Sequence, residues 1–293
     1  MDQTQTQSGV DAALAETKLA LVEEILRSLG TKRLCVAYSG GVDSAFLLAV
    51  AARTLGAENV VAAIGVSPSL PQRERVEAAA LARQLGCECV EIATTELADA
   101  DYVVNSAQRC YFCKADLYTH LQKLCKERGL TTIVNGANAD DSGDYRPGMR
   151  AADDFAVRSP ILEANMNKAE VRFLSGRMGL PTADKPAMAC LASRFAYGTP
   201  LSADGLKRVE QAEDYLWNLG LRNFRVRHHG NLARVELPAD RIAEFAEPAR
   251  RAELVAKLKQ IGYTYVTLDL QGFRSGSGNE VLTQIGLPKR NGS

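Results

Sequence analysis

The sequence predicts an α/β protein in which a parallel sheet has helices on both faces, followed by a small C-terminal α+β domain. Two observations predict this fold. Through Asn135, short apolar runs alternate with helix-length segments, which is typical of βαβ units around a buried parallel sheet. From about Pro181 the alternation stops, and a segment rich in proline and glycine leads into a helix, a hairpin pattern, further helix and a last strand. The length of 293 residues suits one large domain or two smaller ones.

The expected elements of the first part follow from apolar periodicity. Strands are expected where short apolar runs lie between polar turns, at Arg33–Tyr38, Val60–Val66, Glu88–Ile92 and Thr131–Asn135. Helices are expected between and before them, at Asp11–Leu29, Asp43–Thr54, Gln72–Leu85 and Lys114–Arg128. The first helix is expected to bury one stripe, made of Leu14, Leu21, Val22, Ile25, Leu26 and Leu29.

The C-terminal part has its own pattern. We expect a helix at Ala203–Leu219, strands at Asn223–Arg227 and Leu232–Leu237, helical residues from Ala239 to Ile261 and a last strand at Tyr263–Leu270. The sequence therefore divides into residues 1–183, a junction loop at 184–202 that carries Cys190, and a substrate domain at 203–293.

Composition narrows the possible partners and the compartment. The 35 Lys and Arg residues balance 35 Asp and Glu residues, so no overall positive charge favours a nucleic acid or a membrane surface. No apolar run approaches the roughly 20 residues of a membrane helix, and residues 1–9 lack the apolar core of a signal peptide. Seven cysteines, an odd number, argue against a secreted disulfide framework. A cytoplasmic protein is expected.

A glycine-rich loop follows the first strand of the predicted sheet, where ligands of parallel sheets bind. In Ser39-Gly-Gly-Val-Asp-Ser44, backbone N–H groups at a helix start, with the two serine hydroxyls, make an anion site. Gly40 and Gly41 let phosphate oxygens approach the main chain. A carboxylate among phosphates would repel them, so Asp43 indicates a Mg²⁺ ion between them. The alternative is a tight turn with an ordinary helix cap.

This loop resembles the pyrophosphate-binding loop of the N-type ATP pyrophosphatases. The resemblance implies an adenine nucleotide alpha hydrolase-like fold and cleavage of ATP between the α and β phosphates. It implies that Ser39, Gly40, Gly41 and Ser44 hold the pyrophosphate while Asp43 binds Mg²⁺ and acts in catalysis. The second expected loop of this site is Asn135–Asn138, after the last strand of the sheet.

The cysteines fall into two groups. Cys35, Cys87, Cys89 and Cys125 lie in or beside expected strands and a helix, where small buried side chains are typical. Cys110 and Cys113 have the spacing at which two thiolates share a metal or cluster, and Cys190 is a third possible ligand. Three thiolates on a [4Fe–4S] cluster leave one iron open for an additional sulfide. The alternative is a pair of packed or surface thiols.

Longer strings resemble the LarE family of ATP-dependent sulfur-inserting enzymes of nickel-pincer nucleotide synthesis. They are Ser39 to Ser44, Arg109-Cys-Tyr-Phe-Cys-Lys114, Asn135-Gly-Ala-Asn138, Met188-Ala-Cys-Leu-Ala-Ser-Arg-Phe195, Val226-Arg-His-His-Gly230 and Leu268-Asp-Leu-Gln-Gly-Phe-Arg-Ser-Gly276. The resemblance implies that ATP adenylates the carboxylates of pyridinium biscarboxylic acid mononucleotide, which become thiocarboxylates. It also suggests a homo-oligomer, a trimer or hexamer, and leaves the sulfide donor unidentified.

Members of that family differ in their source of sulfur. Those with a single cysteine at the position of Cys190 sacrifice its sulfur, whereas those with three cysteines are understood to bind a [4Fe–4S] cluster. Because Cys110 and Cys113 accompany Cys190, this sequence resembles the cluster type, with Cys190 as a catalytic residue.

Arginines in the hairpin are candidates for binding an anionic substrate. Arg225 and Arg227 are two residues apart on a strand and so share a face, and Glu236 on the facing strand could orient an arginine. Ser193 and Arg194 follow Cys190 and are expected to hold a substrate carboxylate. The alternative is a solvated basic edge. His228 and His229 receive no role, and a polar hairpin turn explains them equally well.

Three rival functions remain open from the sequence. A tRNA thiolation enzyme is disfavoured by the neutral charge. An ammonia-using ATP pyrophosphatase ligase leaves the Cys-x-x-Cys unexplained. A nucleotide-binding sensor should bind ATP without releasing pyrophosphate.

Overall fold

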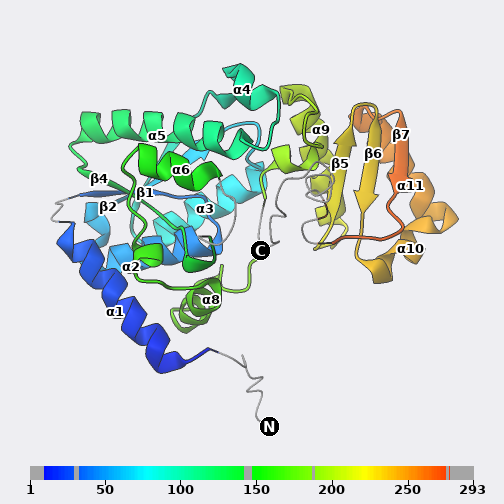
Figure 1. Ribbon diagram of the computed structural model, residues 1–293. Coiled ribbons are helices and arrows are strands. Elements are labelled where there is room, and N and C mark those ends of the chain that lie inside the picture. The colour runs from blue at the N-terminus through cyan, green and yellow to red at the C-terminus, as the bar shows by residue number, and fades with distance from the viewer. Residues whose placement is uncertain (1–9, 30–32, 142–146, 187–188, 275–276, 278–293) are drawn as a thin grey trace, which may run out of the picture. The chain divides into compact units, whose positions relative to one another are not determined.

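The computed structural model describes residues 10–29, 33–141, 147–186, 189–274 and 277. They form two compact units (Figure 1). Unit 1 comprises Met1–Val66, Gln72–Thr94 and Cys113–Ala187, and unit 2 comprises Ser67–Pro71, Thr95–Phe112 and Met188–Ser293. This division differs from the three consecutive segments expected from the sequence, because two stretches of the first half of the chain belong to unit 2.

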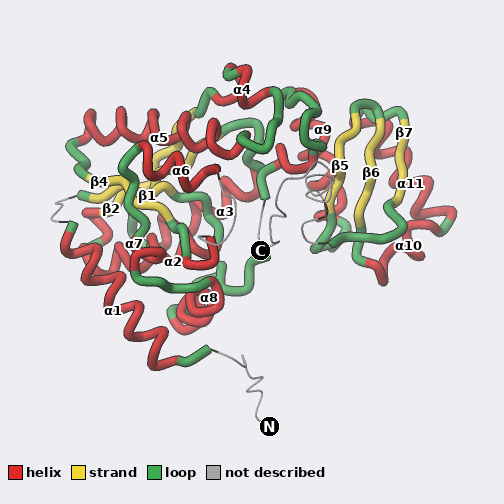
Figure 2. The backbone as a smooth tube through the Cα atoms, viewed as in Figure 1, coloured by secondary structure: helices red, strands yellow, loops and turns green. Residues whose placement is uncertain are grey.

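Unit 1 contains a parallel sheet, drawn in yellow in Figure 2. Its strands are β1 (Leu34–Ala37), β2 (Val60–Val66), β3 (Glu88–Ala93) and β4 (Thr132–Asn135), in the order β3-β2-β1-β4. The central strand β1 is buried throughout, as expected for a parallel sheet covered on both faces. The predicted strands and the parallel sheet are confirmed.

Helices cover both faces of this sheet, with α5 and α6 on one face and α1, α2 and α8 on the other (Figure 1). The helices of unit 1 are α1 (Ala12–Ser28), α2 (Val42–Leu55), α3 (Gln72–Gln84), α5 (Arg109–Arg128, whose first residues belong to unit 2), α6 (Pro147–Asp154), α7 (Pro160–Glu163) and α8 (Lys168–Arg177). Because α5 begins at Arg109 rather than Lys114, the Cys-x-x-Cys lies inside the helix.

The stripe predicted for α1 is partly wrong. Leu14 and Leu21 are 47% and 41% exposed, and the buried stripe is Ala15, Leu19, Val22 and Leu26. Val22 and Leu26 belong to both stripes, whereas Ala15 and Leu19 are buried in place of Leu14 and Leu21. A helix that packs closely on other helices can bury a small residue such as Ala15, so leucine content alone did not identify its inner face.

Helix α8 was not predicted, although its start has a clear signal. The Asn167 side chain accepts the N–H of Glu170 at 2.9 Å, and the Glu170 carboxylate accepts the N–H of Asn167 at 2.7 Å. This reciprocal capping box fixes the first turn. Glu170 also pairs with Lys18 at 2.8 Å, which ties α8 to α1.

Unit 2 is built on a mixed sheet in the order β5-β6-β7. Its elements are α4 (Ala100–Val103), α9 (Ala203–Asn218), β5 (Arg225–His229), β6 (Leu232–Glu236), α10 (Ile242–Ala246), α11 (Pro248–Ile261) and β7 (Tyr265–Leu268). The predicted hairpin is confirmed as β5 paired antiparallel with β6, and β7 runs parallel to β6. Apolar side chains of α9, α11 and one sheet face form its core, with Leu216, Val226, Val235 and Leu258 fully buried.

The described helices include none that combines the length and the apolarity needed to cross a membrane.

Candidate functional site

The phosphate loop lies between β1 and α2, as the sequence predicts. Gly41 is the N-cap of α2, and the Ser39 and Ser44 hydroxyls lie 3.1 Å apart. The Ser44 hydroxyl also contacts the N–H of Ser39 at 3.3 Å and the carbonyl of Gly41 at 3.1 Å. These contacts close the loop over the N-terminus of a 14-residue helix, where N–H groups without helical partners and the helix dipole favour an anion.

Two glycines are required by this close packing. Gly40 has φ of 74°, and a Cβ atom there would lie 2.6 Å from the Ala78 Cβ. At Gly136, after β4, a Cβ atom would lie 2.7 Å from the Ser44 nitrogen and 2.9 Å from the Asp43 carbonyl carbon. The loops after the neighbouring strands β1 and β4 therefore touch through their backbones.

The Gly136→Ala substitution is expected to weaken ATP binding at least about tenfold, because the added methyl pushes on backbone that cannot move aside. We expect it to lower the free energy of unfolding by about 1–3 kcal/mol. The control is Gly176→Ala in α8, where a Cβ meets nothing within 4 Å, and which should be neutral or stabilising by about 0.5–1 kcal/mol. Calorimetric titration with ATP and urea denaturation measure both effects; equal ATP affinity in the two variants would contradict the prediction.

Asp43 presents an unsatisfied carboxylate oxygen. Its Oδ1 is buried and has no hydrogen-bond partner among the described residues. Burial raises the pKa of this carboxyl above its ordinary value, and Asp141 adds to the rise, while Lys168, Asn138 and Arg172 only partly oppose it. A buried carboxylate oxygen without a donor fits a hard cation, so the donor chemistry at this position suits Mg²⁺.

Sequence reasoning missed several charged neighbours of Asp43. The Asp140 carboxylate accepts the N–H of Lys168 at 2.9 Å, which joins the loop after β4 to the start of α8. Asn138 and the Lys168 and Arg172 side chains interact with the Asp43 carboxylate. Lys168 and Arg172 are thus cations beside the expected phosphate site. The capping box marks the start of α8 in the sequence, but no sequence signal places that helix beside Asp43.

The proposed cluster ligands lie in exposed or half-buried positions. Cys110 and Cys113 are half-buried in the first turns of α5, and Cys190 is exposed directly before the 3-10 turn Leu191–Arg194. Among the described residues, no three acidic, histidine or cysteine side chains are arranged to hold a metal ion. The cluster assignment therefore stays a prediction. Of the other cysteines, Cys35, Cys87 and Cys125 are buried as expected, and Cys89 is half-buried.

A buried cation accompanies two of these thiols. Arg109 is 4% exposed, donates to the Asn105 side chain and donates to the Ala192 carbonyl at 3.1 Å. Burial alone would lower the pKa of the Arg109 guanidinium, but electrostatic attraction to Cys190 and Cys110 outweighs it and the pKa rises. Arg109 thus places a buried positive charge near two of the three proposed ligand thiols.

Arg194 has protein partners for its whole guanidinium group. Its side chain is fully buried, and Nε and Nη2 each donate to the Glu213 carboxylate at 2.9 Å. Nη1 donates to the carbonyls of Ala189 and Cys190, at 2.7 and 3.2 Å, and to the Ser193 hydroxyl. The guanidinium therefore holds the shape of the Cys190 turn, and its expected contact with a substrate carboxylate stays a prediction.

Ser193 also belongs to this turn. Its hydroxyl donates to the Cys190 carbonyl at 2.8 Å, and its own carbonyl accepts from Arg227 at 3.0 Å. These contacts connect the Cys190 turn to β5 within unit 2, and the expected contact of Ser193 with substrate stays a prediction.

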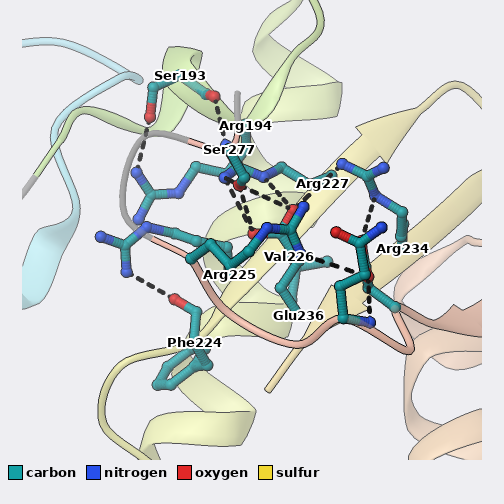
Figure 3. Close-up of polar contacts among 12 residues, drawn as sticks. Ser193, Arg194, Phe224, Arg225, Val226, Arg227, Arg234, Glu236 and Ser277 are labelled. Carbon is teal, nitrogen blue, oxygen red and sulfur yellow. Dashed lines mark hydrogen bonds and ion pairs between the residues drawn. The ribbon is translucent and has the colours of Figure 1, made fainter. Parts of the chain in front are cut away.

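Arginines gather on the sheet face of unit 2 that points away from its core (Figure 3). Arg227 donates to both Glu236 carboxylate oxygens, at 2.9 and 3.0 Å, and Glu236 is fully buried. Arg234 and Ser277 contact the same carboxylate. The expectation that Glu236 orients an arginine is confirmed, and Arg225 shares the face of Arg227, as predicted.

Arg225 differs from its neighbours because no carboxylate pairs with it among the described residues. Its Nη1 donates to the Phe224 carbonyl at 2.6 Å, and its guanidinium lies 4.9 Å from the Phe273 ring centroid. Burial, together with Arg194 and Arg227, lowers the pKa of this guanidinium to about 10. A cation whose charge is disfavoured by its surroundings gains most from a bound anion, so Arg225 is the strongest candidate for a phosphate or carboxylate contact.

The histidines of the hairpin have structural surroundings. His228 is buried, lies 3.1 Å from the Tyr263 hydroxyl through Nδ1 and stacks on Phe195 with centroids 4.5 Å apart. Burial lowers the pKa of His228, which keeps the ring neutral. His229 is exposed at the end of β5. His228 thus packs between Phe195 and Tyr263 in unit 2.

The Arg225→Ala substitution is expected to raise the KM for an anionic mononucleotide about 10- to 100-fold, the effect of losing a charged hydrogen bond of about 1.5–3 kcal/mol. The KM for ATP should stay within about twofold. Arg222→Ala is the control, since Arg222 is exposed and stacks on Trp217 at 3.6 Å. Steady-state pyrophosphate release at varied substrate concentration measures the change, and equal KM values for the two variants would argue against an anion site at Arg225.

Known proteins resemble this chain both in the region of the phosphate loop and over most of its length. A family model described as NAD synthase matches residues 14–117, which contain the loop. An uncharacterized protein of Synechocystis is 44% identical over 92% of this chain and 100% of its own length. The pyridinium-3,5-bisthiocarboxylic acid mononucleotide synthase of Lactiplantibacillus plantarum is 37% identical over 94% of this chain and 98% of its own. The chain belongs to the LarE family.

Family membership agrees with the predicted fold and with an ATP pyrophosphatase domain. A more distant relative, an uncharacterized protein of Methanocaldococcus jannaschii, is 26% identical over 88% of this chain and 97% of its own length. The three relatives thus match over 88–94% of this chain.

Proposed function

We propose that this protein is an ATP-dependent sulfurtransferase that converts carboxylates of pyridinium-3,5-biscarboxylic acid mononucleotide into thiocarboxylates. The observation that carries the proposal is the 37% identity, over 94% of the chain, to a protein named for making the bisthiocarboxylic acid mononucleotide. The closed phosphate loop of unit 1, and Arg225 of unit 2, which pairs with no carboxylate among the described residues, support two anion sites, as such a reaction needs.

The first step activates a carboxylate. A substrate carboxylate oxygen attacks the α-phosphorus of ATP, the bond to the β-phosphate oxygen breaks, and pyrophosphate leaves. Ser39, Gly40, Gly41 and Ser44 bind the pyrophosphate through N–H and hydroxyl donors, which stabilises the charge that develops on the leaving group. Asp43 would hold Mg²⁺, which neutralises phosphate charge when bound.

The second step replaces AMP by sulfur. A sulfur nucleophile attacks the acyl carbon of the adenylate, the acyl–oxygen bond breaks, and AMP leaves with a thiocarboxylate as product. Arg225 binds an anionic group of the mononucleotide, and Arg227, fixed by Glu236, completes the basic face with Ser193 beside it. Arg194 and Glu213 hold the Cys190 turn in shape.

Cys110, Cys113 and Cys190 would hold a [4Fe–4S] cluster. The donor set fits such a group, since all three thiols are at least partly exposed and a buried arginine lies near two of them. A cluster with one open iron supplies sulfide without consuming a side chain. The residues present thus favour repeated turnover over loss of the Cys190 sulfur.

Substrate-dependent pyrophosphate release tests the reaction class. With ATP, Mg²⁺ and the biscarboxylic acid mononucleotide, we expect AMP and pyrophosphate in equal amounts. Formation of ADP would exclude adenylation, and pyrophosphate release stimulated by tRNA instead of the mononucleotide would favour a tRNA thiolation enzyme.

Anaerobic purification with iron and acid-labile sulfide assays tests the cluster. We expect about four irons per chain in the wild type and loss of iron in Cys110→Ser, Cys113→Ser and Cys190→Ser. Cys89→Ser, at a half-buried thiol outside the proposed set, is the matched control and should retain iron. An iron-free protein that loses the Cys190 sulfur during turnover would overturn the assignment.

We also propose a cellular compartment, a sulfur source and an oligomeric state for this protein. Cysteines outside disulfides and an oxygen-sensitive cluster would suit the reducing cytoplasm, and a sulfide donor of unidentified kind would have to supply the sulfur. We further propose a homo-oligomer, trimer or hexamer, which sedimentation of the purified protein tests.

A further inference from the structure

Asn105, in the turn between α4 and α5, is a fully buried polar residue of unit 2. Its Nδ2 donates to the carbonyls of Ala196 and Thr199, at 2.8 and 3.0 Å, and its own carbonyl accepts the N–H of Gly198 at 3.0 Å. Its φ of 56° lies in the left-handed region, which asparagine adopts more readily than most residues. Asn105 thus binds the loop that follows the Cys190 turn.

Arg109 connects Asn105 to the Cys190 turn itself, again within unit 2. Its side chain is buried, and Nη1 donates both to the Asn105 Oδ1 and to the Ala192 carbonyl, the latter at 3.1 Å. Arg109 directly precedes Cys110, and Ala192 lies two residues after Cys190. One side chain therefore joins the two backbone segments that carry these thiols.

The contacts of Asn105 and Arg109 are directional. A hydrogen bond weakens steeply when its donor and acceptor leave their preferred distance and angle, so it fixes two backbone segments more narrowly than apolar packing does. Both side chains are buried, where a hydrogen bond that is not made is costly. Arg194 holds the Cys190 turn in shape, whereas Arg109 ties that turn to the start of α5.

We propose that Asn105 and Arg109 are positioning residues that hold the Cys190 turn against the first turn of α5, and so set the separation of the Cys110 and Cys190 sulfurs before any metal is bound. Neither side chain needs to touch the substrate for this role. Thiols that are already in place lose less conformational freedom when they ligate a cluster. This benefit for cluster assembly rests on the proposed function, whereas the separation is a property of the metal-free protein.

Crosslinking of the two thiols in the metal-free, full-length protein tests the proposal. A Cys113→Ser background removes the neighbouring thiol, and a short bismaleimide then bridges Cys110 and Cys190, which mass spectrometry of a digest detects. Because bridging depends on the effective concentration of one thiol at the other, we expect Arg109→Ala and Asn105→Ala to lower its yield at least about fivefold. The yield is expressed relative to labelling of each thiol by a monofunctional maleimide, which corrects for changes in thiol reactivity.

Leu258→Ala in α11 is the matched control, since Leu258 is fully buried in the core of unit 2 and contributes to its stability. It should lower the urea midpoint of unfolding but leave bridging unchanged. If an alanine variant does not fold, Arg109→Lys gives the same comparison. It keeps a cation but loses the planar fork of the guanidinium, and we expect it to lower bridging at least about twofold.

The proposal is overturned if Arg109→Ala and Asn105→Ala bridge as well as the wild type at Arg109 and Asn105, or if that parent protein does not bridge although Cys110 and Cys190 are both labelled singly. Anaerobic reconstitution with iron and sulfide, with Cys113 intact, separates this result from the proposed function. We expect both alanine variants to hold less iron than the wild type. Bridging that depends on Asn105 and Arg109 in a protein that binds no iron would support the positioning role and contradict the cluster.

Discussion

The Asp43→Asn substitution is expected to reduce pyrophosphate release at least about 100-fold without destabilising the metal-free protein. Activity falls because the amide keeps the shape of the side chain but removes the charge that would hold Mg²⁺, a loss of several kcal/mol of transition-state stabilisation. Stability should be equal or higher, because burial raises the pKa of Asp43 and its ionised form is costly in the folded protein.

Asp153→Asn in α6 is the control for this experiment, since it removes one negative charge at an exposed position of the same unit. Pyrophosphate release is measured at saturating ATP, and thermal unfolding is followed in the presence of a chelator. A variant that is destabilised along with its loss of activity would show that Asp43 has a structural role, and an active variant would exclude it as the metal ligand.

The Glu213→Gln substitution is expected to lower the free energy of unfolding of unit 2 by about 3–5 kcal/mol, the cost of leaving one partner of a buried ion pair unpaired. Gln keeps an oxygen for the N–H of Val226, which Glu213 accepts at 3.0 Å, so the loss reports on the pair with Arg194. Arg194 would keep its cation at 0% side-chain exposure without a counter-charge.

The same variant has a predicted pH dependence. Burial alone would raise the pKa of Glu213, but Arg194 outweighs it and holds the pKa below the ordinary value of 4.5. A lowered pKa means that the pair stabilises the fold above about pH 4.5 and loses this contribution as the pH falls through the folded value. The difference in the free energy of unfolding between the wild type and Glu213→Gln should therefore become smaller as the pH is lowered.

Urea denaturation followed by the fluorescence of Trp217, the single tryptophan, reports on unit 2. Glu253→Gln is the control, because Glu253 pairs with Arg250 on the surface at 58% and 43% side-chain exposure and should change stability by less than about 0.5 kcal/mol. Equal decreases in the free energy of unfolding of the two variants at neutral pH would contradict the predicted stabilisation by the buried pair of Arg194 and Glu213.

Much of the fold was predictable because local signals and tertiary context agree in it. β2 was predicted at its observed bounds, and the hairpin of β5 and β6 follows from the alternation around a turn with glycine. The phosphate loop was predictable since its residues are consecutive in the sequence. The relation of Arg227 to Glu236 was also accessible, because antiparallel strands joined by a short turn fix which residues face each other.

The remaining parts depend on contacts between distant segments, which no local pattern encodes. Arg194 looked like a substrate ligand because it follows Cys190, yet Glu213, 19 residues away, takes its charge. Lys168 and Arg172 approach Asp43 only through the packing of α8, and the sequence contains no short spacing that joins them. Leu14 and Leu21 are a further example, because the elements that pack against α1 determine which of its faces is buried.

The contacts of the Glu213 carboxylate limit which substitutions can alter the substrate preference of this protein. It binds Arg194 of the Cys190 turn and the N–H of Val226, which lies between Arg225 and Arg227 on β5. The turn that carries Cys190 and the strand that carries Arg225 and Arg227 are thus joined by one side chain. Engineering a new substrate preference should therefore leave Glu213 and Arg194 intact, together with Arg227, which also donates to the Ser193 carbonyl, and should vary the remaining outward positions of β5 and β6.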